Sequence, residues 1–545
     1  AQAPDRLGPH DRADPLARPG RAHPPAVTAA APPAAGRRIE GALFAAFVLL
    51  YLLPLWAVER VPTNDGPSHL YNAWLVRELA WGDPHPLLDA AYDLRREPIP
   101  NWLGHAALAL LMTVVSPVVA EKLLLSACIA LFLVGLRALA GTVEPEARRW
   151  AWLGFPLAYN FLFQAGFTNF CLGLGLAMLA LAVWWRRRHR PGLATALLLN
   201  ALLLLGYFAH IVTTLLALAA IGLLWLLTLR RASLRLHLRH LAILAPQALL
   251  PLWFVASRGM APLGREWSGE QLWSYLLQLE VLWTFSAAQL GLGRALAAAW
   301  GVLAVATLLR ENVDWRVSGA GLTGRVRMRL RQADLFLLLA LLAVALYAAA
   351  PPGLAGGTLV KQRLSLVPYL VLVPWFSPRL GRWFGRFAVA ALALLAAAVL
   401  AAQLRWHRQW AGEQRAFLRA LAGVPPHARF VPLLFARYEG SSRVAPLYHA
   451  TGYPAIEKEL VDWSNYEAAS DLFPVRFAPG LARPDIWTLE ANPHAYQVGV
   501  HRDRVDAIYT WKLRAGTPVA GRLRRHYDLV RQDGDGRLYL RKRRR

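Results

Sequence analysis

The chain is poor in charged residues, which make up only 17% of its 545 residues, whereas a soluble globular protein carries about a quarter. Cysteine is almost absent, and the two that occur, Cys128 and Cys171, lie inside apolar runs. The sequence therefore offers no disulfide framework and no zinc-finger spacing, and both cysteines are expected to be small apolar core residues. It also lacks a P-loop and a dinucleotide-binding fingerprint, which excludes the enzyme classes built on those motifs.

Hydrophobic residues are abundant, at 56% of the chain, and they gather in long runs. A membrane-spanning helix needs roughly 20 apolar residues, and fewer when polar side chains at its ends reach the interface. Runs of this kind occur at 41–57, 119–139, 150–165, 168–185, 192–207, 211–229, 241–257, 288–309, 334–350, 364–377 and 387–404. We therefore predict a polytopic α-helical membrane protein with about eleven transmembrane helices.

The net charge is +26, but the basic residues sit in short loops between apolar runs, which favours membrane topology signals over nucleic-acid binding. With the N-terminus in the cytoplasm, the inner loops hold arginine clusters at 148–149, 186–190, 230–239, 310–331 and 379–386. The short outer loops hold only Arg258, Arg265, Lys361 and Arg363. This asymmetry predicts a multi-pass protein of the bacterial inner membrane, with a cytoplasmic N-terminus and an extracytoplasmic C-terminus.

Composition divides the chain into segments. Residues 1–36 are rich in Pro, Ala and Arg, and we expect a disordered cytoplasmic tail there. The membrane domain is expected over 37–404, an amphipathic connecting helix over 405–423, and a small mixed α/β extracytoplasmic domain over 424–545. Residues 101–116 are apolar but short, and counting them as a span would place the RRRHR loop outside. We therefore expect them to form an interfacial helix within a first outer loop that covers 58–118.

The most informative stretch, Val61-Pro-Thr-Asn-Asp-Gly-Pro-Ser-His-Leu-Tyr, follows the first predicted span. If a helix starts at Pro67, Asp65 and His69 lie one turn apart on the same side. A lone carboxylate at the membrane surface can act as a catalytic base. It can also be a helix cap, since Asp before Gly-Pro is a common turn former, and spacing alone leaves both interpretations open.

This arrangement resembles the GT-C superfamily of membrane glycosyltransferases, which includes the protein O-mannosyltransferases and the lipid A aminoarabinose transferase. In that superfamily the first outer loop carries an essential Asp, which would be Asp65, and a membrane-hugging helix, which would be 101–116. A basic residue before a late Pro-containing helix contacts the donor phosphate, and Lys361-Gln-Arg-Leu-Ser-Leu-Val-Pro resembles that element. Many members have a second acidic residue in the second outer loop. Here residues 164–169 offer only the polar residues Gln164, Thr168 and Asn169. The metal requirement is therefore unknown, and a divalent metal ion remains possible.

The resemblance implies transfer of a sugar from a polyprenyl-phosphate-linked donor to a glycan, lipid or protein acceptor, with inversion. Asp65 would be the general base, with His69 beside it. Lys361 and Arg363 would neutralise the departing phosphate, although both could equally be cations that reach the membrane interface. Further candidate site-lining residues are Asn64, Tyr71, Gln164, Asn169 and His210, the last of which could instead be a satisfied histidine at a helix tip.

The C-terminal segment has its own polar and aromatic cluster, whose role the sequence leaves undecided between sugar binding and an ordinary surface. Its members are Tyr448, His449, Tyr453, Glu457, Asp462, Asn465, Tyr466 and Glu467. Two other functions compete with the glycosyltransferase. One is a lipid or polysaccharide transporter or flippase, which the lack of charged residues at mid-span disfavours. The other is a non-catalytic assembly protein of the cell envelope.

Overall fold

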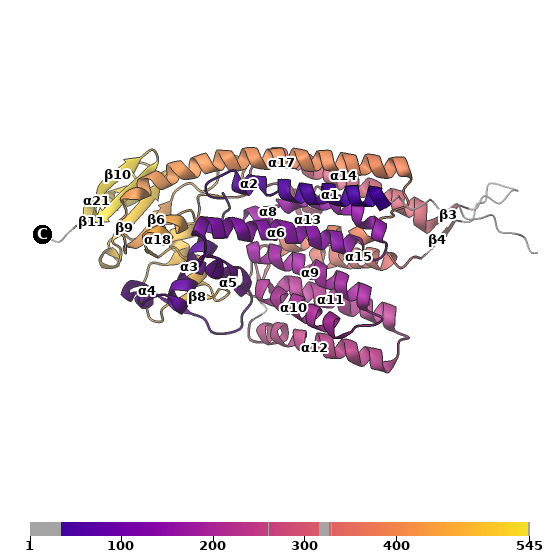
Figure 1. The fold of residues 1–545 in the computed structure, drawn as a ribbon. Coiled ribbons are helices and arrows are strands. Elements are labelled where there is room, and N and C mark those ends of the chain that lie inside the picture. Colours follow the sequence, from indigo (N-terminus) through magenta and orange to yellow (C-terminus); the bar gives the residue numbers. More distant parts are fainter. Residues whose placement is uncertain (1–33, 260, 316–325, 329, 543–545) are drawn as a thin grey trace, which may run out of the picture.

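The computed structural model describes residues 34–259, 261–315, 326–328 and 330–542. Long helices lie side by side in a bundle, and the last of them leads into a β-sheet domain at one end (Figure 1). The first loop of the chain, with α3 to α5, lies at this same end. Most of the predicted N-terminal tail, residues 1–33, lies outside the described residues, and residues 34–36 already belong to α1.

Among the described residues, seven helical segments are long and apolar enough to cross a membrane, which confirms the prediction of a multi-pass α-helical membrane protein. Five of them expose most of their surface, since 28% or less of the apolar window is buried at Arg38–Trp56, Ile211–Leu229, Leu234–Ala256, Ala287–Asn312 and Trp383–Gly423. Such exposed apolar faces suit lipid contact. The count of about eleven spans stays a prediction.

The helices of the bundle are α1 (Ala34–Leu50), α2 (Leu53–Trp56), α6 (Pro117–Ala140), α9 (Thr168–Arg187), α10 (Leu193–Ala209), α11 (Ile211–Leu229), α12 (Leu234–Ala256), α14 (Leu290–Thr307), α15 (Asp334–Ala349), α16 (Val360–Leu372) and α17 (Arg382–Arg419).

The apolar run at 150–165, which we expected to be one span, is broken in the structure. It forms the end of a 3-10 helix, η1 (Pro145–Leu153), followed by α7 (Gly154–Ala158) and α8 (Phe161–Gln164). The break falls at Tyr159 and Asn160, and the Asn160 side chain accepts hydrogen bonds from the amides of Leu162 and Phe163 to start α8. Irregular backbone at membrane depth is tolerated where protein buries it, and this segment is almost wholly buried.

The first loop folds into α3 (Gly66–Trp81), α4 (Pro86–Ala91), a short strand β1 (Tyr92–Leu94) and α5 (Trp102–Leu111). The expected helix within 101–116 is thus shorter than the apolar run, and its placement at a membrane interface stays a prediction. β1 pairs antiparallel with β8 (Val475–Phe477) of the C-terminal region. The first loop is therefore joined by backbone hydrogen bonds to a segment that follows the last helix of the bundle.

The last helix and the predicted connecting segment are one continuous helix, α17, of 38 residues. At 1.5 Å per residue it is about 57 Å long, longer than the roughly 30 Å hydrocarbon core, so its second half extends beyond a bilayer. The boundary that we predicted at residue 404 is therefore a change of composition within one helix. A short 3-10 turn, η6 (Ala420–Gly423), ends it.

The C-terminal region contains a five-stranded mixed sheet in the order β10-β11-β9-β6-β7, which confirms the mixed α/β prediction. β6 (Arg429–Leu434) runs parallel to both of its neighbours, β7 (Val461–Asp462) and β9 (Ala507–Trp511). β11 (Gly536–Arg541) pairs antiparallel with β9 and with β10 (Tyr527–Asp533). The helices around it are α18 (Gly452–Glu457), α19 (Tyr466–Ala469), α20 (Ile486–Ala491) and α21 (Pro518–His526). Smaller elements elsewhere are α13 (Gly269–Leu277), η2 (Glu280–Leu282), η5 (Val373–Trp375), the strand pair β2 (Pro262–Leu263) and β5 (Gly353–Leu354), and the strand pair β3 (Val313–Trp315) and β4 (Val326–Met328).

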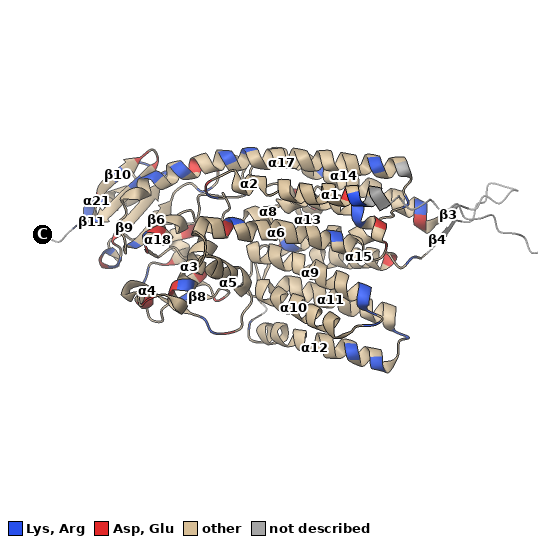
Figure 2. Ribbon diagram, viewed as in Figure 1, with Lys and Arg blue, Asp and Glu red and all other residues tan. Residues whose placement is uncertain are grey.

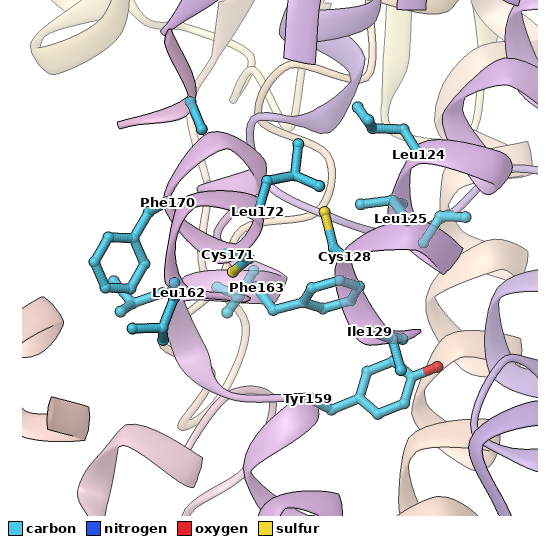
Figure 3. Close-up of a cluster of buried hydrophobic side chains, with 14 of the residues drawn as sticks. Leu124, Leu125, Cys128, Ile129, Tyr159, Leu162, Phe163, Phe170, Cys171 and Leu172 are labelled. Carbon is cyan, nitrogen blue, oxygen red and sulfur yellow. The ribbon is translucent and has the colours of Figure 1, made fainter. Parts of the chain in front are cut away.

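The helices α6 and α9 pack closely in the centre of the bundle. A Cβ atom at Gly175 would lie 2.6 Å from Leu131, so this approach requires glycine. Cys128 and Cys171 face the same apolar cluster, together with Phe163 (Figure 3), and both are buried and free, which confirms their predicted core role. This packing fixes the start of α9 and the turn before it, which forms one wall of the candidate site.

Figure 2 shows Lys and Arg at the ends of α1, α12 and α17 that lie farthest from the C-terminal sheet. This distribution fits the predicted orientation, which a labelling experiment would test. Ala515 is exposed in the C-terminal region and Ser233 is exposed at the start of α12, while the two native cysteines are buried. We expect Ala515→Cys to react with an impermeant thiol reagent in intact spheroplasts and Ser233→Cys to react only after lysis. The reverse pattern would invert the topology.

Candidate active site around Asp65

The turn that carries Asp65 is fastened to the turn between α8 and α9. The backbone amide of Asn64 donates to Gln164 O at 2.9 Å, and that of Asp65 donates to Ala165 O at 3.2 Å. Gly166 has a φ of +92°, and a Cβ atom there would lie 2.8 Å from the Asp65 backbone. Only glycine fits both conditions. The turn around Asp65 and the predicted second outer loop, residues 164–169, are therefore held together by backbone hydrogen bonds.

Asp65 occupies the N-cap position of α3, but its side chain makes no capping hydrogen bond. Its carboxylate instead accepts hydrogen bonds from the Asn64 side-chain amide and the Tyr466 hydroxyl. His449 Nε2 lies 3.4 Å from Asp65 Oδ1, and 17% of the Asp65 side chain is exposed. Burial raises the pKa of Asp65 to about 6, against the opposing effects of His69 and Asn64. The group is therefore largely ionised at neutral pH and is more basic than an ordinary aspartate.

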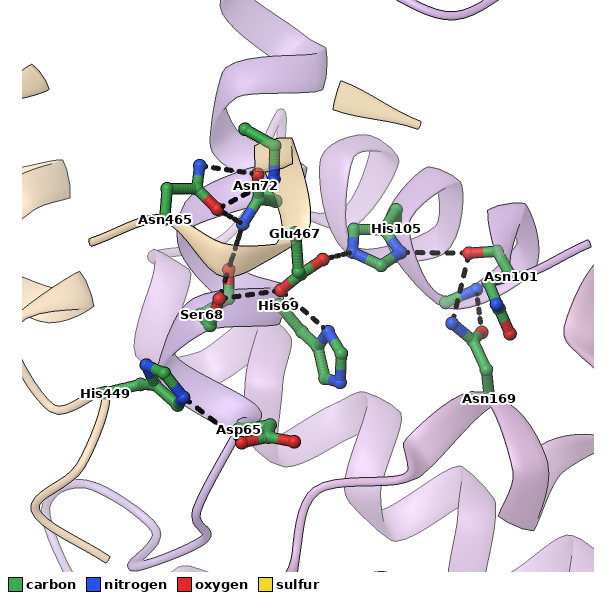
Figure 4. Close-up of polar contacts among 12 residues, drawn as sticks. Asp65, Ser68, His69, Asn72, Asn101, His105, Asn169, His449, Asn465 and Glu467 are labelled. Carbon is green, nitrogen blue, oxygen red and sulfur yellow. Dashed lines mark hydrogen bonds and ion pairs between the residues drawn. The ribbon is translucent and has the colours of Figure 1, made fainter. Parts of the chain in front are cut away.

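A buried carboxylate, Glu467, organises the residues beside Asp65 (Figure 4). It accepts hydrogen bonds from Ser68 Oγ and from His105 Nε2, each at 2.7 Å. His69 Nδ1 lies 3.0 Å from Glu467 Oε1, but the angle does not meet hydrogen-bond geometry, so this contact is an ion pair. Glu467 thus joins α19 of the C-terminal region to α3 and α5.

The groups in this cluster shift one another's pKa values. Burial disfavours ionised Glu467, but the two histidines outweigh it and hold the pKa of Glu467 well below its usual range. Burial likewise lowers the pKa of His69, but the carboxylates of Glu467 and Asp65 outweigh that effect and raise it. The cluster is therefore a buried arrangement of two carboxylates that favour the charged form of the His69 imidazole between them.

Asn169 belongs to the same network but does not face Asp65. Its Oδ1 accepts from the Gly104 amide at 2.8 Å, and its Nδ2 donates to Asn101 O at 3.1 Å. The same Asn101 carbonyl lies 3.0 Å from His105 Nδ1. Because a carbonyl and a carboxylate only accept, both ring nitrogens of His105 donate, Nδ1 to Asn101 O and Nε2 to Glu467. Asn169 therefore sets the start of α5 and, through it, the orientation of His105.

Arg363 lies on the other side of the same turn. Its guanidinium stands 4.8 Å from the centre of the Phe167 ring, and Phe167 is the residue after Gly166. The side chain is buried, and its Nε has no partner among the described residues. His210 is within electrostatic reach of Arg363, packs its ring against Phe170, and accepts a hydrogen bond from the Val212 amide to cap α11. The segment 166–170 thus lies between the Arg363 guanidinium, which faces Phe167, and the Asp65 turn, which contacts Gly166.

The structure does not bring all of the predicted site residues together. Lys361 Nζ donates to Ala348 O at 3.3 Å and lies 3.8 Å from Glu266 Oε2, since residues two apart on a helix point in different directions. The Tyr71 hydroxyl donates to Leu460 O at 2.6 Å and serves the contact with the C-terminal region. The Gln164 side chain faces Gln403 and His407 of α17.

An apolar cavity of about 180 Å³ opens between α9, α11, α15 and α16. Two of its lining residues come about one helical turn after His210 and Arg363. Thr213 comes three residues after His210, and Val367 comes four residues after Arg363. The rest of the lining is formed by side chains such as Leu174, Leu216, Leu339 and Leu370. A buried cation one helical turn before an apolar cavity suits a ligand with a phosphate and a hydrocarbon chain.

Several residues that complete the site were not assigned to it from the sequence. Glu467, His449 and Tyr466 belong to the cluster whose role the sequence left undecided, and His105 lies within an apolar run. A single histidine in such a run was the one local sign that α5 has a buried polar partner. His69, His105 and Glu467 could also hold a metal ion, but the two imidazoles already neutralise this carboxylate.

No protein-family model and no curated protein matches this chain. The solved structures that are similar to it include those of ArnT from Cupriavidus metallidurans in the apo state and bound to undecaprenyl phosphate. They share 12% identity with it over 92% and 93% of its length and 98% of theirs, with TM-scores of 0.47 and 0.43. These neighbours are of the kind that the sequence resemblance names.

Proposed function

We propose that this chain is a membrane glycosyltransferase that moves a sugar from a polyprenyl-phosphate-linked donor to an extracytoplasmic acceptor. The observation that carries the proposal is the placement of Asp65 and Arg363 on two sides of the segment 165–167. One is a basic carboxylate, and the other is a buried cation one helical turn before Val367, which lines an apolar cavity. Transfer from a lipid phosphate requires both groups, a base for the acceptor and a cation for the leaving group.

In this mechanism the acceptor hydroxyl gives its proton to the Asp65 carboxylate while its oxygen bonds to the anomeric carbon. The bond between that carbon and the phosphate oxygen breaks, and the lipid phosphate leaves as an anion beside Arg363. Attack opposite the leaving group inverts the anomeric centre without a covalent enzyme intermediate. A carboxylate with a pKa of about 6 is a stronger base than an ordinary aspartate and is still ionised at neutral pH.

His69 and Glu467 act through Asp65 as positioning residues. The positive charge on His69 favours the ionised form of Asp65, and Glu467 keeps that charge on His69. The network thus opposes the effect of burial, which alone would raise the pKa of Asp65 further. The C-terminal region contributes directly, because Tyr466, His449 and Glu467 all contact the first loop.

Another cavity, of about 480 Å³, lies between segments that neighbour the site residues in sequence, and we assign it to the acceptor or the sugar. Ser442 and Gln362 line it, and they are near neighbours in sequence of Ala445, whose amide donates to Asn64 Oδ1, and of Arg363. The aromatic rings of Trp267 and Tyr275 and the charges of Glu280 and Arg443 also line it. Aromatic faces with a few polar groups suit a sugar ring. The transporter and envelope-assembly alternatives have no specific observation in their favour among the described residues.

The phosphate part of the proposal is tested by Arg363→Ala. A charge-assisted hydrogen bond contributes about 1.5–3 kcal/mol, so we expect KM for the donor to rise by about tenfold or more. Arg363→Lys should restore binding only in part, because the planar fork is lost. Initial rates at varied donor concentration measure both effects.

Lys361→Ala is the matched control, since its ammonium lies against Ala348 and Glu266. We expect a smaller change in donor KM for this variant than for Arg363→Ala. Unchanged donor kinetics in Arg363→Ala would leave Arg363 as a cation that only packs on Phe167, and the phosphate site would have to be sought elsewhere.

A further inference from the structure

A second cluster of possible metal ligands shares no residue with the site around Asp65. His85 is at the start of α4, His427 precedes β6, and Glu459 precedes β7. His85 Nε2 lies 3.2 Å from His427 Nδ1 and 3.3 Å from Glu459 Oε2, and His427 Nδ1 lies 3.2 Å from the same oxygen. The three ligand atoms therefore form a nearly equilateral triangle.

Hydrogen bonds alone cannot satisfy this triangle. If both facing nitrogens carry protons, both can donate to Glu459, but two N–H groups then oppose each other at 3.2 Å. If only one carries a proton, its N–H donates to the other nitrogen or to Glu459, and the lone pair of the second nitrogen still faces the carboxylate oxygen. With neutral rings and an ionised carboxylate one edge is therefore always unfavourable, whereas a cation at the centre attracts all three atoms.

The triangle also has the dimensions of a zinc site. Ligand atoms about 2.0–2.1 Å from Zn²⁺ in a tetrahedron lie about 3.3–3.4 Å apart, which agrees with the observed edges. We propose that His85, His427 and Glu459 bind Zn²⁺, with water in the fourth position. The cluster is open to solvent, since the side chains of His427 and Glu459 are 54% and 46% exposed, so an ion can enter.

The backbone at two of the three ligands supports a built site. His427 and Glu459 both adopt left-handed conformations, with φ of 56° and 53°. Such conformations cost non-glycine residues of order 1 kcal/mol or more each. The two loops are joined by a hydrogen bond from the His427 amide to Lys458 O at 2.8 Å. Together these features direct two side chains toward the His85 imidazole across the gap between the C-terminal region and the first loop.

Loading the site moves a proton within His85. Its Nδ1 accepts from the Leu88 amide at 3.3 Å, so in the metal-free chain the proton of the neutral ring is on Nε2. Zinc at Nε2 displaces this proton, and Nδ1 must then carry one, at the expense of the contact with Leu88. The ion would clamp α4 to the loops before β6 and β7. It would thereby hold the first loop, which also carries Asp65, on the C-terminal region.

The test uses the full chain in detergent, purified without a metal-affinity resin and stripped with chelator. Zinc is then titrated against a fluorescent chelator of known affinity, and thermal unfolding is followed with and without zinc. We expect one Zn²⁺ per chain and a higher Tm with zinc, because the ion binds only the folded chain. His427→Ala and Glu459→Gln should each weaken zinc binding by about a hundredfold or more and abolish the rise in Tm.

Two further variants make the result specific. Glu457→Gln changes an exposed glutamate two residues before Glu459, which pairs with Arg60, and should bind zinc like the wild type. His105→Ala removes one possible ligand of the other, buried cluster, which is formed by His69, His105 and Glu467, and it should also keep zinc binding. Failure of the wild-type chain to bind zinc would overturn the proposal. Zinc that persists in His427→Ala and Glu459→Gln but is lost in His105→Ala would overturn it too, by assigning the ion to the buried cluster.

Discussion

Asp65→Asn is expected to lower the rate of sugar transfer by about a hundredfold or more, in a chain that still folds and still binds its donor. Asparagine keeps the shape of the side chain but cannot accept the proton of the acceptor hydroxyl. If Asp65 were only a helix cap, asparagine would replace it with little effect, since the two residues cap about equally well. The structure weakens that alternative, because Asp65 stands at the N-cap position of α3 without a capping hydrogen bond.

Asp462→Asn is the matched control for this experiment. Asp462, in β7 of the C-terminal region, is also a buried aspartate, and burial raises its pKa to about 6 as well. Its oxygens accept from Ser464 and Thr451. We expect this variant to lose stability and to keep its transfer rate per folded molecule. Near-normal transfer by well-folded Asp65→Asn protein would remove Asp65 from the mechanism.

The pH dependence of the wild-type rate gives an independent check. A general base must be deprotonated, so kcat/KM should be constant above the pKa of Asp65 and fall as the pH drops below about 6. An acidic limb near pH 4 would indicate an unperturbed carboxylate instead. The limb is measured from initial rates at low donor concentration across a pH series in which the chain stays folded.

The sequence predicted the local parts of this site well, because they depend on near neighbours. A helix does begin next to Pro67, and it places His69 one turn after Asp65, as the spacing indicated. The apolar runs predicted the membrane class for the same reason. The run at 150–165 is not the single helix that we expected, since hydrophobicity alone does not reveal that the helix ends at Ala158 and restarts at the Asn160 cap inside a protein core.

Contacts between distant segments could not be predicted from one sequence. Glu467 meets His69 and His105 because β1 pairs with β8 and the C-terminal region folds back onto the first loop. The zinc ligands that we propose come from the same two regions and have no regular spacing. In both cases the residue types were visible in the sequence, but their juxtaposition depends on tertiary structure.

The second large effect is expected for Glu467→Gln, which should destabilise the chain strongly. Glu467 is fully buried and balances the charge of His69 and His105. Removing one partner of a buried ion pair costs about 3–5 kcal/mol, because the remaining charge is left uncompensated. We expect a clearly lower Tm in detergent. Glu457→Gln makes the same chemical change at an exposed ion pair with Arg60, which contributes about 0–1 kcal/mol, and should leave Tm nearly unchanged.

The same Glu467→Gln variant should also shift the acidic limb of the rate profile toward higher pH. Without Glu467, burial favours neutral His69, and Asp65 loses the positive charge that most opposes the rise in its pKa. Loss of the negative charge on Glu467 acts in the opposite direction, but it is a smaller influence on Asp65 than His69. The pKa of Asp65 therefore rises, and the base is protonated over more of the neutral range. A lower Tm with an unshifted limb would make Glu467 purely structural, whereas a shifted limb shows that its charge reaches the base through His69.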